Sequence, residues 1–227
     1  MRRTACLYIL ALALVACAPS PTSAPATESP LPIATADPAE AVVEVGNAAA
    51  QIAAAVTAAP TDRRDGAAVR GYTVHGELVL LRAGGNELVC LADTPGDERF
   101  QVACYHVALE PYMRRGRQLR AEGVSGPDSF EVRHAEIEAG TLAMPRDPTM
   151  VYNLGGAESM HDPTSGAVDE DFGRRVHAVY TPYATEESTG LSTTPPTAGA
   201  PWIMRPGTPT SHIMVVMAPL KTDEEAD

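Results

Sequence analysis

The residues best suited to chemistry in this chain of 227 residues are histidines and carboxylates in its C-terminal half. His161 and Asp162 are neighbours in a Gly-rich segment, and His177 lies in an expected strand. Imidazole and carboxylate groups bind divalent metal ions, so these three residues would form a metal site if the loops converged. Their spacing matches no known metal motif, and the alternative is three unrelated side chains.

A second candidate is a ligand site in the segment 181–201 and the strands after it. This segment is longer than an ordinary connection, and long ordered loops often carry function. The alternatives are a surface loop that covers a sheet edge and, at the last of these positions, a histidine with a structural role. The candidate ligand-binding residues are Tyr183, Glu186, Glu187, Ser188, Trp202 and His212.

One basic patch stands out in an otherwise acidic sequence. Four arginines (Arg114, Arg115, Arg117 and Arg120) fall within an expected helix at 109–122. Guanidinium groups of this kind bind carboxylates and phosphates. The alternative is a solvated helix face that pairs with the acidic groups of the chain itself.

Several function classes are disfavoured by composition and by missing motifs. The sequence has no Gly-x-Ser-x-Gly, phosphate-loop, His-Glu-x-x-His, Gly-x-Gly-x-x-Gly or Cys-x-x-Cys-His pattern, so no cofactor is predicted. The formal net charge of −12 at pH 7 argues against nucleic acid as a partner.

The N-terminus begins with Arg2 and Arg3, followed by an apolar run at 5–15. This run is too short to span a bilayer, which takes roughly 20 residues, and suits a secretory signal. It ends in Leu14-Val15-Ala16-Cys17, which resembles a bacterial lipobox. The alternative is an ordinary signal peptide that happens to end in Cys.

The lipobox resemblance implies removal of residues 1–16 as a signal peptide and acylation of Cys17, so that lipid holds the protein at a membrane. The expected location is therefore the cell envelope, after export. Because Ala18 stands where enteric bacteria use Asp as an inner-membrane retention mark, the outer membrane is favoured if the host has one.

The same resemblance decides which cysteines can pair. Cys6 would leave with the signal and Cys17 would carry lipid, which leaves Cys90 and Cys104 in an oxidising compartment. We expect a disulfide between these two. The alternatives are a free pair or a two-thiolate metal site, although the spacing is not the close Cys-x-x-Cys of such sites.

The mature chain divides by composition into a Pro/Ala/Ser/Thr-rich tether at 17–36, an Ala-rich helix at 37–60, a globular domain at 61–220 and an acidic tail at 221–227. The tether is expected to be disordered. The domain is expected to be α+β, with an antiparallel sheet, two or three helices and one disulfide in a hairpin.

The expected strands begin with a three-stranded meander. Strands at 77–82 and 87–92 flank the tight-turn signal Gly84-Gly85-Asn86, and 99–105 returns with Cys104 opposite Cys90. Helices are expected at 109–122 and 128–139. The remaining strand candidates are 149–154, 175–180, 202–205 and 211–217, the last two forming a hairpin.

Three segments carry a further resemblance, to a set of secreted bacterial proteins of unknown function. They are Glu138-Ala139-Gly140-Thr141-Leu142, the run from Tyr183 to Leu191, and the run from Pro201 to Met214. The resemblance covers roughly 71–216 and implies no activity. We therefore expect a membrane-anchored envelope lipoprotein with a non-catalytic domain that binds a ligand or a protein partner. The alternative is a metal-assisted hydrolase that uses His161, Asp162, His177 or His212.

Overall fold

The structure is a computed structural model, and it describes residues 44–196 and 199–221. The expected signal peptide at 1–16, the lipidation site Cys17 and the tether at 17–36 lie outside the described residues, as does most of the acidic tail. None of the helices in the two described ranges has the length and apolar character needed to cross a membrane.

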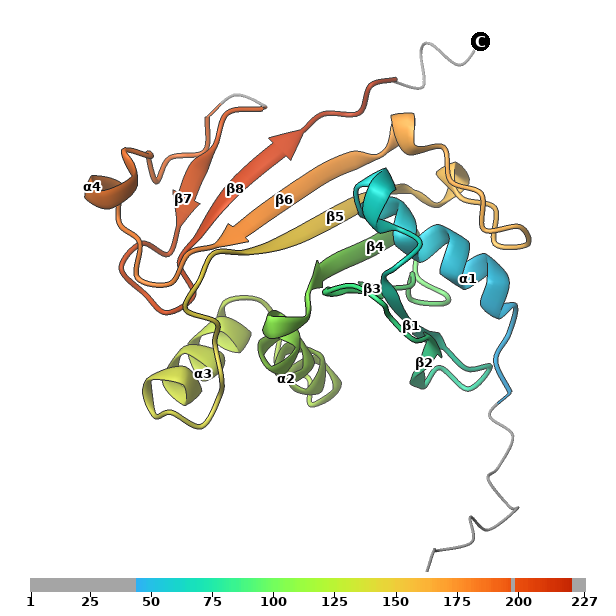
Figure 1. Ribbon diagram of the computed structural model, residues 1–227, viewed down its shortest axis with the longest axis horizontal. Helices are drawn as coiled ribbons and strands as arrows, with labels where there is room; N and C mark the ends of the chain where they lie inside the picture. Colours follow the sequence, from blue (N-terminus) through green and yellow to red (C-terminus); the bar gives the residue numbers. More distant parts are fainter. Residues whose placement is uncertain (1–43, 197–198, 222–227) are drawn as a thin grey trace, which may run out of the picture. The chain divides into compact units, whose positions relative to one another are not determined.

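The strands form one sheet of eight in the order β2-β1-β3-β4-β5-β6-β8-β7 (Figure 1). Every neighbouring pair is antiparallel except β1 and β3, which are parallel. The expected α+β class is confirmed, but the sheet is mixed and larger than expected. The strands are β1 (Ala68–Tyr72), β2 (Leu78–Arg82), β3 (Leu88–Leu91), β4 (Arg99–His106), β5 (Thr149–Ala157), β6 (Arg174–Tyr180), β7 (Trp202–Met204) and β8 (His212–Met217).

The expected three-stranded meander is wrong in its first half. Strand β1 lies between β2 and β3, so Gly84-Gly85-Asn86 connects two strands that do not pair. The physical reason is burial. Val69 on β1 is completely buried, whereas Leu80 on β2 is 57% exposed, so β1 takes the interior position and β2 the sheet edge.

The second half of the meander, with its disulfide, is confirmed. Cys90 on β3 and Cys104 on β4 are register partners in an antiparallel pair, and they are bonded to each other. Both side chains are completely buried. The disulfide therefore joins two neighbouring strands inside the protein core.

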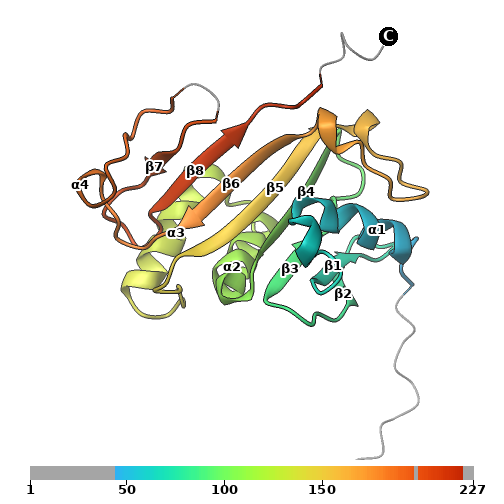
Figure 2. The same ribbon diagram turned by 45° about the horizontal axis from the view of Figure 1, so that its top comes forward.

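Helices cover both faces of the sheet (Figures 1 and 2). On one face, α1 (Ala48–Ala55) and the 3-10 turn after it pack through alanines on Phe100, Val102 and Cys104. On the other face, α2 (Glu110–Ala121) and α3 (Gly126–Glu138) lie side by side. There Tyr112 packs with Tyr105 and Val151.

The helices agree with expectation at α2 and α3 but not at the N-terminal end. The first seven residues of the expected helix at 37–60 lie outside the described residues; within them, α1 begins at Ala48, where the Asn47 side chain caps it by accepting from the Ala50 N–H. Its alanines belong to the core of the sheet, so the helix is part of the domain rather than a separate segment. A short fourth helix, α4 (Glu186–Thr189), was not expected. The hairpin of β7 and β8 is confirmed.

Removing the disulfide should destabilise the domain. Replacing both Cys90 and Cys104 by Ala frees a loop of about 15 residues in the unfolded chain, which lowers the free energy of unfolding by roughly 3 kcal/mol in the chain-entropy model. Urea unfolding of the wild type and the double variant measures this difference. The disulfide would also be expected to make wild-type stability sensitive to reductant. An unchanged urea midpoint of the wild type after addition of a reductant would contradict this contribution of the disulfide.

Candidate metal site

Three strands bring two carboxylates and an imidazole to one end of the sheet. Asp93 follows β3, and Glu158 follows β5 at the start of a 3-10 turn that ends just before His161. Strand β4 pairs antiparallel with both β3 and β5, so β3 and β5 run in the same direction. Their C-terminal ends therefore meet at the same end of the sheet, although Asp93 and Glu158 are far apart in the sequence.

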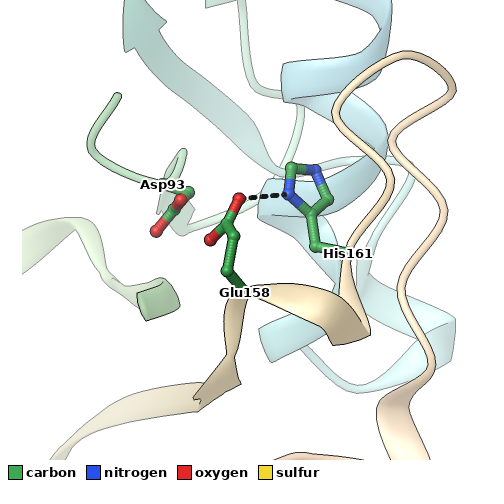
Figure 3. Close-up of side chains that lie close together, drawn as sticks. All are labelled: Asp93, Glu158 and His161. Carbon is green, nitrogen blue, oxygen red and sulfur yellow. Dashed lines mark ion pairs between the residues drawn. The ribbon is translucent and has the colours of Figure 1, made fainter. Parts of the chain in front are cut away.

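The three side chains lie close together, and the Glu158 carboxylate and the His161 ring point toward each other (Figure 3). Each offers one ligand atom, and these atoms all lie within 4.8 Å of one another. His161 Nδ1 is 3.7 Å from Glu158 Oε1. Two ligands of one zinc ion can be at most about 4.4 Å apart, because each lies about 2.0–2.2 Å from the metal. A bound ion thus needs a small contraction, which the Glu158 side chain, 47% exposed, is free to make.

His161 is the most constrained member of the group. Its ring packs against the Phe100 ring with the centroids 4.8 Å apart, and its side chain is only 10% exposed. The Nδ1 atom is buried and has no hydrogen-bond partner within the described residues. An unsatisfied buried polar atom costs about 1–3 kcal/mol, and a metal ion bound at Nδ1 would remove that cost.

Asp93 is held in place by the start of β4. Its Oδ1 accepts a hydrogen bond of 2.7 Å from the Gln101 N–H, which leaves the second oxygen free to face the group. Burial raises the pKa of the Asp93 carboxyl to about 6, and the negative charges of Asp97 and Glu158 act in the same direction. A bound cation would oppose both effects, because it favours the ionised carboxylate.

The group lies in the wall of a pocket of about 390 Å³. Helix α1, the end of β1 with the residues after it, the turn between β3 and β4 and the segment after β5 line this pocket. The last segment is fixed against α1 by Asn47, whose Nδ2 donates to the Thr164 carbonyl at 2.5 Å. Gly166 adopts φ +75° against the Ala50 backbone, where a Cβ atom would collide. The pocket is therefore built by contacts between distant parts of the chain.

Of the metal ligands expected from the sequence, only His161 belongs to this group. Asp162 is exposed and turns away, accepting from the Thr164 N–H and the Ser165 hydroxyl. His177 lies on β6 with its ring edge against Tyr152. Asp93 and Glu158 were missed, and their one shared sequence signal is that each carboxylate closely follows a strand.

The candidate ligand-binding residues of the 181–201 segment are largely engaged in local structure. The Tyr183 hydroxyl donates to Glu138, and Ser188 forms the capping box of α4 with Thr185. Trp202 and His212 are buried on β7 and β8. Glu186 accepts from the Thr193 N–H, and Glu187 is exposed. None of the six lines the pocket beside Asp93.

Comparisons of the chain with protein-family models, with curated proteins and with solved structures gave no match.

The raised pKa of Asp93 predicts how the metal-free domain responds to pH. The pKa is about 6 in the folded state against 3.8 as the ordinary value. The folded state therefore gains stability from protonated Asp93 below pH 4, and this gain is lost as the pH rises through 6.

The variant Asp93→Asn lacks this titration and is the matched reference. In a chelating buffer, the free energy of unfolding of the wild type should fall relative to Asp93→Asn between about pH 4 and pH 7. Urea unfolding of both proteins across this range measures the difference. Parallel profiles of the two proteins would contradict the assignment.

Proposed function

We propose that this protein is an exported, lipid-anchored binding protein whose domain takes up a divalent transition-metal ion at Asp93, Glu158 and His161. The observation that carries the proposal is the buried Nδ1 of His161, which lacks a hydrogen-bond partner and faces two carboxylates in the wall of a pocket. A histidine with a purely structural role would normally have its buried nitrogen satisfied.

The ligand types favour zinc or a similar ion over magnesium or calcium. Zn²⁺ accepts both imidazole and carboxylate ligands, whereas Mg²⁺ and Ca²⁺ prefer oxygen ligands alone. Burial of His161 and Asp93 also favours an ion that accepts few water ligands. We take Zn²⁺ as the probe for this reason.

The number of ligands supports a second candidate function, a metal-assisted hydrolase. Catalytic zinc sites keep three protein ligands and leave one position for water or substrate. The pocket of about 390 Å³ beside the three residues leaves room for such a position. Metal-dependent turnover of an ester by the zinc-loaded protein would favour this function, and its absence would favour metal uptake alone.

The envelope location is proposed on the N-terminal sequence. Leu14-Val15-Ala16-Cys17 has the lipobox pattern, and the Pro-rich stretch at 17–36 suits a tether between membrane and domain. Two or three acyl chains would hold the protein durably, since each buried CH₂ contributes roughly 0.8 kcal/mol. The buried disulfide of the domain is consistent with an oxidising compartment.

Zinc titration of the complete chain tests the metal site. Isothermal titration calorimetry should detect one Zn²⁺ bound per chain. The variants Asp93→Asn and His161→Gln should each raise Kd by about tenfold or more, because each removes one ligand (a tenfold change is about 1.4 kcal/mol).

The matched controls change the same residue types outside the group. Asp162→Asn alters the exposed neighbour of His161, and His177→Gln alters a histidine on β6. Both should bind Zn²⁺ as the wild type does. Equal affinity of His161→Gln and His177→Gln would show that zinc binds elsewhere and would end the proposal.

The lipid anchor is tested separately. In a bacterial host that processes lipoproteins, labelled palmitate should enter the wild type and be absent from Cys17→Ala, because acylation requires that sulfur. Gel fluorography of the purified proteins provides the measurement. Equal labelling of the two proteins, or no labelling of either, would exclude Cys17 as the anchor.

A further inference from the structure

The opposite face of the sheet carries a pocket of different chemistry. It has a volume of about 270 Å³ and lies between α2, α3 and the strands β3, β4 and β5. Figures 1 and 2 show the two helices together on this face, away from α1. Three arginines (Arg117, Arg120 and Arg133) line the pocket, and none of the described lining residues is acidic.

The charges of these arginines are only partly neutralised by the protein. Arg117 pairs with Glu110 at 2.8 Å, and Glu110 also accepts from the Tyr105 hydroxyl. Arg120 and Arg133 form no ion pair with an acidic group of the described residues. A pocket with uncompensated positive charge is unusual in a chain whose formal net charge is −12.

Arg133 is the decisive residue, because it is only 8% exposed. Its Nε donates to the Ser129 carbonyl at 3.0 Å, and its guanidinium lies 4.0 Å from the centre of the Tyr112 ring. These neutral partners orient the group but do not cancel its charge. Burying a charge without an opposite charge is costly, so the site is suited to receive an anion.

The start of helix α3 faces the same pocket. Ser125, Gly126 and Ser129 line it, and the Ser125 side chain makes no capping hydrogen bond to the helix. In the first turn of this helix of 13 residues, Gly126 and Asp128 have backbone N–H groups, whereas Pro127 has none. The helix dipole places partial positive charge there, and the Asp128 carboxylate of the same turn offsets part of it. A helix N-terminus and a buried guanidinium on one pocket both favour an oxyanion.

Apart from Tyr105 and Asn153, the remaining lining is apolar and limits the kind of anion. Leu91, Met113, Phe130 and Val151 contribute side chains to the pocket. We propose that this pocket binds a small organic oxyanion, a phosphate or carboxylate carried on an apolar or aromatic body. The charged head lies between Arg133, Arg120 and the start of α3, and the apolar body packs on the strands.

Calorimetric titration of the complete chain in a chelating buffer tests this site, with phenyl phosphate and benzoate as probes. Inorganic phosphate shows how tightly the anionic group binds by itself, and benzyl alcohol shows how tightly an uncharged aromatic ring binds. At least one of the two aromatic anions should bind more tightly than both inorganic phosphate and benzyl alcohol. Absence of binding by both aromatic anions at millimolar concentration would overturn the proposal.

Variants locate the binding. Arg133→Gln should raise Kd for the aromatic anion about tenfold or more, and Arg120→Gln should raise it several-fold. Arg114→Gln is the matched control. Arg114 is exposed and lies on α2, as Arg120 does, but it does not line the pocket. If Arg133→Gln does not fold, Arg120→Gln decides alone, and an affinity equal to that of Arg114→Gln overturns the proposal. Asp93→Asn should bind the anion normally, so the outcome is independent of the metal site.

Discussion

The structure depends on burial of the strands β3, β4 and β5 on both faces. Side chains alternate along β4, so that Phe100, Val102 and Cys104 face α1 while Tyr105 faces α2 and α3. A slip of one residue in register would send each set to the wrong face. The disulfide between the register partners Cys90 and Cys104 excludes such a slip between β3 and β4.

These strands position two pockets of opposite charge: they line the basic pocket themselves, and the segments that follow β3 and β5 line the acidic pocket. Leu91 and Tyr105 line the basic pocket, while Ala92 and Asp93 line the acidic pocket at the end of β3. Each pocket then takes its charged groups from segments on its own face. The segment after β5 supplies Glu158 and His161, and the helices supply the arginines. The sheet separates the two sets, so neither neutralises the other.

The sequence predicted the local features well. The expected helices at 109–122 and 128–139 lie within two residues of the observed bounds of α2 and α3, and the expected strand at 99–105 sets Cys104 opposite Cys90. The sequence analysis expected no strand at β1, and it paired β2 with β3 because Gly84-Gly85-Asn86 has the local signature of a hairpin. The choice between β1 and β2 for the interior position depends on long-range burial, which local turn chemistry does not encode.

The sequence analysis also missed the metal group, because this group too depends on long-range contacts. Its carboxylates come together only because β4 pairs with both β3 and β5, and no short motif records that pairing. His161 was recognised as a possible ligand, but its partners were sought only in the C-terminal half, at Asp162 and His177. The arginines of α2 were noticed as a patch, whereas the buried Arg133 comes from α3 and becomes significant only when the two helices pack together.

Ligand binding at either pocket would stabilise the folded protein. Each holds an ionisable group whose charge is not fully compensated, the buried Arg133 on one face and the half-buried Asp93 on the other. A ligand that binds only the folded protein stabilises it by RT ln(1 + [L]/Kd), and two such ligands add when they bind independently. Coupling of their affinities would need two alternative arrangements of the shared strands. Because the disulfide holds β3 and β4 in a single register, the strand pair between the pockets offers no second arrangement, and the two sites are expected to act independently.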